Sequence, residues 1–300
     1  MKYTFLDSGA FSMSRESRKN NPNKSSDRSF YESRYFWDYI DDYAQFILSQ
    51  KGSIDYYANV DTSHYPDITW NVQKYLEEEY GLSPLPVIHH GESLSWIKKY
   101  LDAGYEYICI GGVAKTKGRS IDFHTWGNKA FHIICPESNN RLPIIKVHGF
   151  AITSIPLMWE YPWYSVDSVT WKKMSYYGQV LFPRWTPGKG WNFRNRPLIL
   201  FMDKQSKYTL RTGKGRHYLG LNAESKRTIR RWLREIEVPM GVRKKGEVIE
   251  SGITNDDHWR CKATIEYFER LSQSMPEWPW AFNPKHDGRL NLLKIARSHV

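Results

Sequence analysis

Apolar runs that end at an acid, a histidine or a glycine pair recur along this 300-residue chain and constrain its fold more than any other feature. The first run, residues 4–6, ends at Asp7 and is followed by Ser8-Gly9, where glycine permits a tight backbone turn. Short apolar runs bounded by turn residues are typical of buried strands. The pattern returns at 54–60 before Asp61, 85–88 before His89, 105–110 before Gly111, 143–147 before His148, and 164–166 before Asp167.

Segments with helical periodicity separate these runs, at residues 30–50, 68–80, 93–103 and 125–135, and two further strands are expected at 179–182 and 197–201. A parallel strand pair needs a crossover connection, which is usually a helix. Eight strands with reactive residues at their C-terminal ends favour an α/β fold, a closed (β/α)8 barrel of the TIM type, whose active site lies at those ends. An open doubly wound sheet is the alternative, although its glycine-rich loop after the first strand is missing.

The expected domain organisation is a barrel over residues 1–240 and a C-terminal extension, residues 241–300, that packs on it. Residues 184–245 contain 17 Lys or Arg and four acidic residues, so the region leading into the extension is strongly basic. The three cysteines, Cys109, Cys135 and Cys261, are too widely spaced for a Cys-type zinc site or a disulfide framework. We therefore expect no zinc subdomain and no metal.

A formal net charge of +11 indicates a polyanionic partner, with nucleic acid ahead of an anionic membrane. The 13 Trp and 20 Tyr residues add candidate platforms for base stacking. No apolar stretch has the length of a bilayer helix and no secretory segment begins the chain, so we expect a cytoplasmic protein without membrane contact. The expected phosphate contacts are Arg15, Arg18, Lys115, Lys117, Arg119, Arg184, Lys189, Arg194 and Arg196.

Asp7 and Asp167 are the most informative pair of acids. Cleavage of a glycosidic bond needs an acid or base at the leaving group and a carboxylate at the anomeric carbon. Opposed strand ends of a barrel can bring such distant residues together, although either Asp can equally cap a turn or helix. Asp61 can bind the N–H groups on the edge of guanine, or can cap the helix that follows it.

Two other functions are compatible with the residues. His89, His90, His148 and Asp167 suggest a metal-dependent barrel hydrolase, which is disfavoured because no His-x-His pair lies on the first strand. A DNA-binding module with a relic pocket is the non-catalytic alternative. It predicts that Asp167→Asn changes no function.

The motifs resemble those of the tRNA-guanine transglycosylase family over about residues 1–202. Asp7-Ser8-Gly9-Ala10-Phe11 is similar to the family's Asp-Ser-Gly-Gly-Phe/Tyr signature, and residues 110–114 are similar to its Gly-Gly-Leu-Ala segment. Asp167 stands where the family has its nucleophile. Ala10 and His90 depart from the expected Gly and Gln, and the family's Cys-x-Cys-x-x-Cys zinc site is missing. This compact, basic form is most similar to the DNA-acting 7-deazaguanine transglycosylases of phages and bacterial modification islands.

The resemblance implies that guanine in DNA is exchanged for a 7-deazaguanine base such as preQ0, with no cofactor, in the host cytoplasm if a phage encodes the chain. Asp167 would form a covalent glycosyl-enzyme and Asp7 would act as general acid and base. Exchange on tRNA is the alternative, and a homodimer or a partner protein is compatible with either. The base would be bound by Ser8, Gly9, Asp61, His90, Gly91, Gly111, Gly112 and Val113.

Overall fold

The computed structural model describes residues 3–10, 12–13, 28–62, 64–113, 120–203 and 216–284. The chain divides into two compact units, which are considered separately below. The first comprises residues 1–152, 160–167 and 278–300, and the second comprises residues 153–159 and 168–277. The division predicted at residue 240 stays a prediction.

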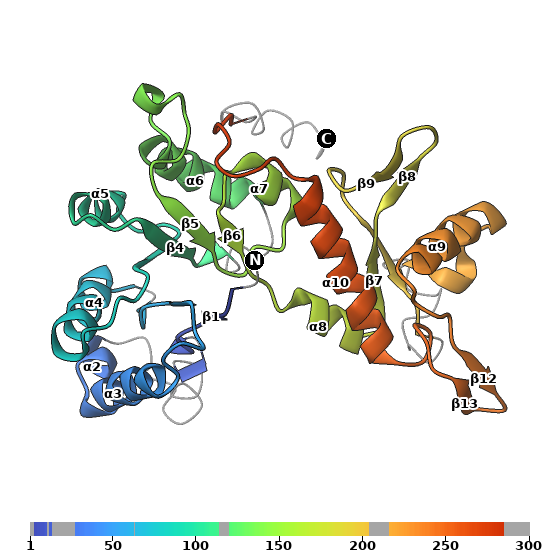
Figure 1. Cartoon of the computed structure of the whole chain (residues 1–300), viewed down its shortest axis with the longest axis horizontal. Coiled ribbons are helices and arrows are strands. Elements are labelled where there is room, and N and C mark those ends of the chain that lie inside the picture. The colour runs from blue at the N-terminus through green and yellow to red at the C-terminus, as the bar shows by residue number, and fades with distance from the viewer. Residues whose placement is uncertain are drawn as a thin grey trace, which may run out of the picture. The chain divides into compact units, whose positions relative to one another are not determined.

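Parallel strands form the centre of the first unit (Figure 1). β3 (Val87–His89), β4 (Tyr107–Gly111), β5 (Lys146–Gly149) and β6 (Ser165–Val166) are neighbours in this order and are all parallel. β1 (Phe5–Leu6) pairs in parallel with β2 (Tyr56–Tyr57). Ala58, which directly follows β2, forms a parallel bridge with Leu85, which precedes β3. The fold is therefore mixed α/β, and closure of these strands into a barrel stays a prediction.

The register of the sheet brings the strand ends to one edge. His89 lies opposite Gly111, Ile110 lies opposite Gly149, and Gly149 lies opposite Val166. Because parallel strands run in one direction, the residues that follow each of them emerge at this same edge. The residues expected to carry chemistry occupy these positions.

Helices connect the strands of the first unit. They are α2 (Arg28–Tyr31), α3 (Arg34–Ser49), α4 (Pro66–Tyr80), α5 (Ser95–Asp102) and α6 (Ser120–Ile134), with a 3-10 turn at Glu137–Asn139. The helix predicted over 30–50 is divided at Ser33, whose hydroxyl accepts the Phe36 N–H and caps α3. Phe36 and Ile40 of α3 pack with Val72 and Leu76 of α4 in a solvent-excluded core.

In the second unit, the predicted seventh and eighth parallel strands are antiparallel to each other. β7 (Gln179–Phe182) pairs antiparallel with β10 (Leu198–Phe201), and β10 pairs in parallel with β11 (Arg216–His217). The expectation of two parallel strands was wrong here, because a hairpin of β8 (Arg184–Thr186) and β9 (Gly190–Asn192) connects them. A parallel pair would have required a crossover.

The second unit also contains α8 (Thr170–Tyr176), α9 (Ala223–Glu235) and α10 (Asp257–Ser274), a 3-10 turn at Tyr218–Gly220, and a hairpin of β12 (Val242–Lys244) and β13 (Glu247–Glu250). α7 (Ile155–Glu160) follows β5 along the chain. α10 packs against α8 and β7 (Figure 1). Buried Arg260 of α10 donates hydrogen bonds to the carbonyls of Ser175 and Ile253. Among the described residues, no helix has the length and apolar character needed to cross a membrane.

Candidate active site

Three carboxylates gather at the C-terminal edge of the parallel strands. Asp7 follows β1, Asp61 follows β2, and Asp167 follows β6 directly. The negative charges of Asp61 and Asp167 both contribute to raising the pKa of Asp7. Burial above all, and then the charges of all three acids, raise the pKa of the Cys109 thiol in β4. Three acids that are distant in sequence therefore lie close enough to act on one another and on one buried group.

Asp7 has the electrostatics of a proton donor. Its pKa is raised, first by partial burial of the carboxyl among protein atoms and then by Asp61 and Asp167. Backbone hydrogen bonds from Gly9 and Ser8 oppose this shift but do not reverse it. Asp7 keeps access to solvent, so a bound substrate can reach it. A carboxyl that retains its proton to higher pH is suited to general acid catalysis.

The turn after Asp7 is held by a tyrosine from α3. The Tyr39 hydroxyl donates a hydrogen bond of 2.5 Å to the carbonyl of buried Ser8. Gly9 has φ +70°, and a Cβ at this position would lie 2.7 Å from the Tyr39 hydroxyl oxygen. Both the backbone angle and the close approach of Tyr39 therefore require glycine at position 9.

Gly9→Ala is expected to destabilise the first unit more than Gly81→Ala. Gly81 ends α4 at φ +62°, and a Cβ at this position would have nothing within 4 Å, so alanine there meets only the backbone penalty of about 1 kcal/mol. Gly9→Ala adds an overlap with Tyr39, which is expected to cost a further ~1–3 kcal/mol. Urea unfolding of both variants measures the difference. Equal losses would contradict the close contact, and Tyr39→Phe should restore part of the loss in Gly9→Ala.

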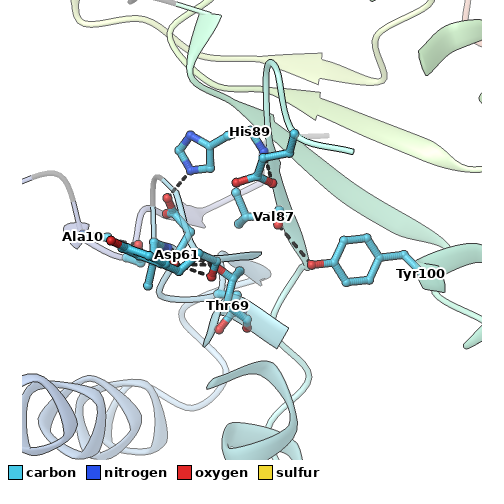
Figure 2. Close-up of polar contacts among 11 residues, drawn as sticks. Ala10, Asp61, Thr69, Val87, His89 and Tyr100 are labelled. Carbon is cyan, nitrogen blue, oxygen red and sulfur yellow. Dashed lines mark hydrogen bonds and ion pairs between the residues drawn. The ribbon is translucent and has the colours of Figure 1, made fainter. Parts of the chain in front are cut away.

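Asp61 is paired with a histidine at the neighbouring strand end. The His89 Nε2 atom lies in close hydrogen-bond contact with Asp61 Oδ2, and both side chains are largely buried (Figure 2). The chain on both sides of Asp61 is held against α4, because the Asn59 side chain donates to the Thr69 carbonyl and the Thr62 N–H donates to Thr69 Oγ1. This pair fixes one oxygen of the acid.

The glycine pair after β4 makes room for the His89 ring. A Cβ on Gly111 would lie 3.2 Å from His89 Cε1, and a Cβ on Gly112, at φ +78°, would lie 3.1 Å from His89 Nδ1. The family resemblance implied that both glycines bind the substrate base. Whether a substrate base also contacts them stays a prediction, since packing against His89 is by itself a reason for both glycines.

A pocket of about 420 Å³ opens beside these strand ends. Its lining includes His90, Gly91 and Gly112 from the predicted base-binding set, together with His64, Pro66, His89, Glu92, Ser93 and Trp96. The His90 ring lies near Phe123 and Trp126, with centroid distances of 5.7 and 5.6 Å. A concave site lined by a tryptophan, imidazole rings and a few other polar groups is compatible with small-molecule binding.

Asp167 is held through one of its two oxygens. Oδ1 accepts a hydrogen bond of 2.7 Å from the Ala151 N–H and lies 3.6 Å from Nε2 of His148. Ala151 has φ +54°, a left-handed conformation that is unfavourable for a residue with a Cβ and that is often found at functional sites. The Asp167 side chain is 46% exposed and so accessible to a large substrate.

Comparison of the chain with protein-family models, curated proteins and solved structures found no match. The geometry of the site therefore carries the functional argument.

The predicted phosphate contacts are only partly described. Arg15, Arg18, Lys115, Lys117 and Arg119 lie outside the described residues. The other four are exposed in the second unit, on or beside the β8–β9 hairpin: Arg184, Lys189, Arg194 and Arg196. Exposed cations on a hairpin are suited to contact with a phosphate backbone. Their role stays a prediction.

Sequence reasoning did not find the residues that orient the acids. Tyr39, Ala151 and Ser165 had no assigned role, and His89 and His148 entered only as ligands of a hypothetical metal. In the described part of the chain, no group of three or more His, Cys, Asp or Glu side chains has the arrangement of a metal site. His89 and His148 instead each lie beside one of the predicted acids, and their positions one strand away from Asp61 and Asp167 were the available signal.

Proposed function

We propose that this protein exchanges guanine in DNA for a 7-deazaguanine base through a covalent glycosyl-enzyme. The observation that carries the proposal is the gathering of Asp7, Asp61 and Asp167. The pKa of Asp7 is raised, and Oδ1 of Asp167 accepts the Ala151 N–H. Base exchange requires one carboxyl group that donates a proton and a second one that acts as the nucleophile. The strong positive charge of the chain supports a nucleic acid substrate.

In the first displacement, Asp167 attacks C1′ of a deoxyguanosine with a carboxylate lone pair. The C1′–N9 bond breaks, its electron pair stays on guanine, and guanine takes a proton from Asp7. In the second displacement, Asp7, now ionised, removes the proton from N9 of the incoming base, whose freed electron pair attacks C1′ and expels the Asp167 carboxylate. Two inversions retain the configuration at C1′.

Recognition of the base is proposed to rest on Asp61 and the neighbouring pocket. The Asp61 carboxylate can accept from N1–H and N2–H₂ of guanine, and His89 orients it for that contact. C1′ and the base edge are hidden in a duplex, so the nucleotide has to be flipped out, at a cost of a few kcal/mol. Trp96 and the imidazole rings of the pocket lining offer stacking that offsets part of this cost.

The expected result of an exchange assay is incorporation of a free labelled base into duplex DNA and not into tRNA. Radiolabelled guanine is a suitable first probe, because the pocket must accept guanine as the leaving base and therefore, by microscopic reversibility, as an incoming one. Labelled 7-cyano-7-deazaguanine is the second probe. Exchange should persist when a chelator is present, since no step uses a metal.

Three results would change the proposal. Label in tRNA alone would keep the chemistry and replace DNA by RNA as the substrate. Label that is lost with chelator would contradict the metal-free mechanism. Label in neither nucleic acid, with both bases tested, would overturn base exchange as the function.

A further inference from the structure

His148 of β5 is buried beside Asp167 in a fixed orientation. Its ring is stacked on Phe5 of β1, with centroids 4.3 Å apart and an interplanar angle of 17°, and it meets the edge of Phe150 at 4.8 Å. Only 3% of the residue is exposed. A histidine held this way between two aromatic rings has little freedom to turn either nitrogen elsewhere.

One ring nitrogen of His148 belongs to a chain of hydrogen bonds. Nδ1 lies 2.6 Å from Ser165 Oγ, and Ser165 Oγ lies 2.7 Å from the Tyr107 hydroxyl. Ser165 Oγ lies between these two groups, so it can accept from the Tyr107 hydroxyl and donate to Nδ1 at the same time. Ser165 then donates to Nδ1, which makes Nδ1 an acceptor and places the proton of the neutral ring on Nε2.

The other ring nitrogen faces the proposed nucleophile. Nε2 is buried, has no hydrogen-bond partner in the described part of the chain, and lies 3.6 Å from Asp167 Oδ1. This separation is too long for a hydrogen bond but short enough for attraction between an N–H dipole and a carboxylate. The opposite tautomer would direct a lone pair at the carboxylate oxygen. The direction of donation is therefore Tyr107 to Ser165, Ser165 to His148, and His148 toward Asp167.

We propose that His148 is a positioning residue that sets the lifetime of the glycosyl-enzyme, an inference that rests on the proposed function. With the Ala151 N–H, it holds Oδ1 and leaves Oδ2 as the oxygen that attacks C1′. In the covalent intermediate Oδ1 is a neutral ester carbonyl, whereas after the second displacement it is part of a carboxylate. An N–H dipole attracts a charged oxygen more strongly than a neutral one. His148 therefore stabilises Asp167 as the group that leaves C1′.

This role predicts an unusual result for His148→Phe, which keeps an aromatic ring against Phe5 but removes both nitrogens. Steady-state exchange should fall by about 10–100-fold, because a leaving carboxylate has lost a donor and its orientation. The fraction of enzyme trapped as a covalent DNA complex should rise several-fold, because breakdown slows more than formation. The dissociation constant for DNA should change by less than about twofold, since His148 does not contact the substrate, whereas KM should fall because the covalent complex accumulates.

Two further variants test the chain of donors. Ser165→Ala should lower turnover and raise the trapped complex as His148→Phe does, but less strongly. It keeps the imidazole ring and removes only the hydroxyl that fixes which ring nitrogen carries the proton. His148→Gln, which retains an N–H donor, should recover part of the turnover. His132→Phe is the matched control, because His132 of α6 is an exposed histidine in the same unit that lies against Phe282. It should leave both readouts unchanged. A parallel fall of turnover and trapped complex in His148→Phe would indicate a merely structural role and overturn the inference.

Histidine ¹⁵N NMR separates this inference from the proposed function. The spectrum should show His148 with a protonated Nε2 and an unprotonated Nδ1, and Asp167→Asn should shift the Nε2 signal. A proton on Nδ1 in the neutral ring would overturn the arrangement of donors. If the wild-type protein forms no covalent complex with DNA or RNA while the NMR result is as expected, the contact stands and the role in exchange is overturned with the proposed function.

Discussion

Replacement of Asp167 by asparagine is expected to remove the covalent DNA complex and lower base exchange by about 10⁴-fold or more. An amide lacks the carboxylate lone pair that would form the bond to C1′. The amide retains an oxygen that can accept the Ala151 N–H, so the local structure should be kept. The complex is measured by mixing enzyme with labelled duplex, quenching with denaturant and separating covalent from free DNA. Affinity for DNA should stay within about threefold, because a single exposed carboxylate contributes little to phosphate binding.

The matched control for this variant is Asp102→Asn, which removes a carboxylate from the exposed end of α5 in the same unit. It should form the complex and exchange bases as the wild-type protein does. Retention of the complex in Asp167→Asn together with its loss in Asp7→Asn would reverse the two catalytic assignments. Unchanged exchange in both would remove the carboxylates from the mechanism.

Much of the first unit could be predicted because its signals are local. The run that ends at Gly111-Gly112 is apolar from Tyr107 onward, and the structure has the buried strand β4 there. The same holds for one strand of the second unit, because the strand expected at 179–182 is β7 with the same bounds. Pro66 at the start of α4 and Gly81 at its end mark that helix in the sequence. Local composition was sufficient where a strand is a continuous buried apolar run or where Pro and Gly mark the ends of a helix.

Strand pairing in the second unit could not be predicted from the same signals. β7 and β10 look alike as apolar runs, but their direction depends on the connection between them. The polar and aromatic residues of that connection form the β8–β9 hairpin, which side-chain periodicity did not reveal. The β12–β13 hairpin was missed for a related reason, because every residue of β13 is exposed and no alternation of burial marks it.

The acids of the candidate site could be predicted from the sequence, but the residues that orient them could not. Asp7, Asp61 and Asp167 each follow an apolar run, so position alone singled them out. The contacts that orient them are made over long separations, as between Tyr39 and Ser8, which are 31 residues apart, or by a backbone N–H such as that of Ala151. Neither kind of contact leaves a pattern in a single sequence.

Asp7→Asn is expected to slow base exchange by about 10²–10⁴-fold while DNA still binds, because the departing guanine loses its proton donor. The pH dependence supplies a sharper test. In the wild-type protein the first displacement needs protonated Asp7, so the rate of complex formation should fall as the pH rises through the raised pKa of this group. The variant should lack this fall. Single-turnover rates over a pH series measure it, and a fall of equal size in Asp7→Asn would assign the proton to another residue.

The same substitution should stabilise the protein at neutral pH. Because the pKa of Asp7 is higher in the folded state than in the unfolded state, its contribution to stability is fully present below the unfolded value of about 4 and is lost as the pH rises through the folded value. Ionised Asp7 then repels Asp61 and Asp167, whereas the neutral amide of the variant does not. We expect the Tm of the variant to exceed that of the wild type by about 1–3 °C at neutral pH, a modest shift for a partly exposed group, and to match it below pH 4. Asp102→Asn should show no such divergence. A lower Tm for Asp7→Asn at neutral pH would mean that the carboxylate stabilises the fold, and Asp7 would then be a turn cap and not a proton donor set among repelling charges.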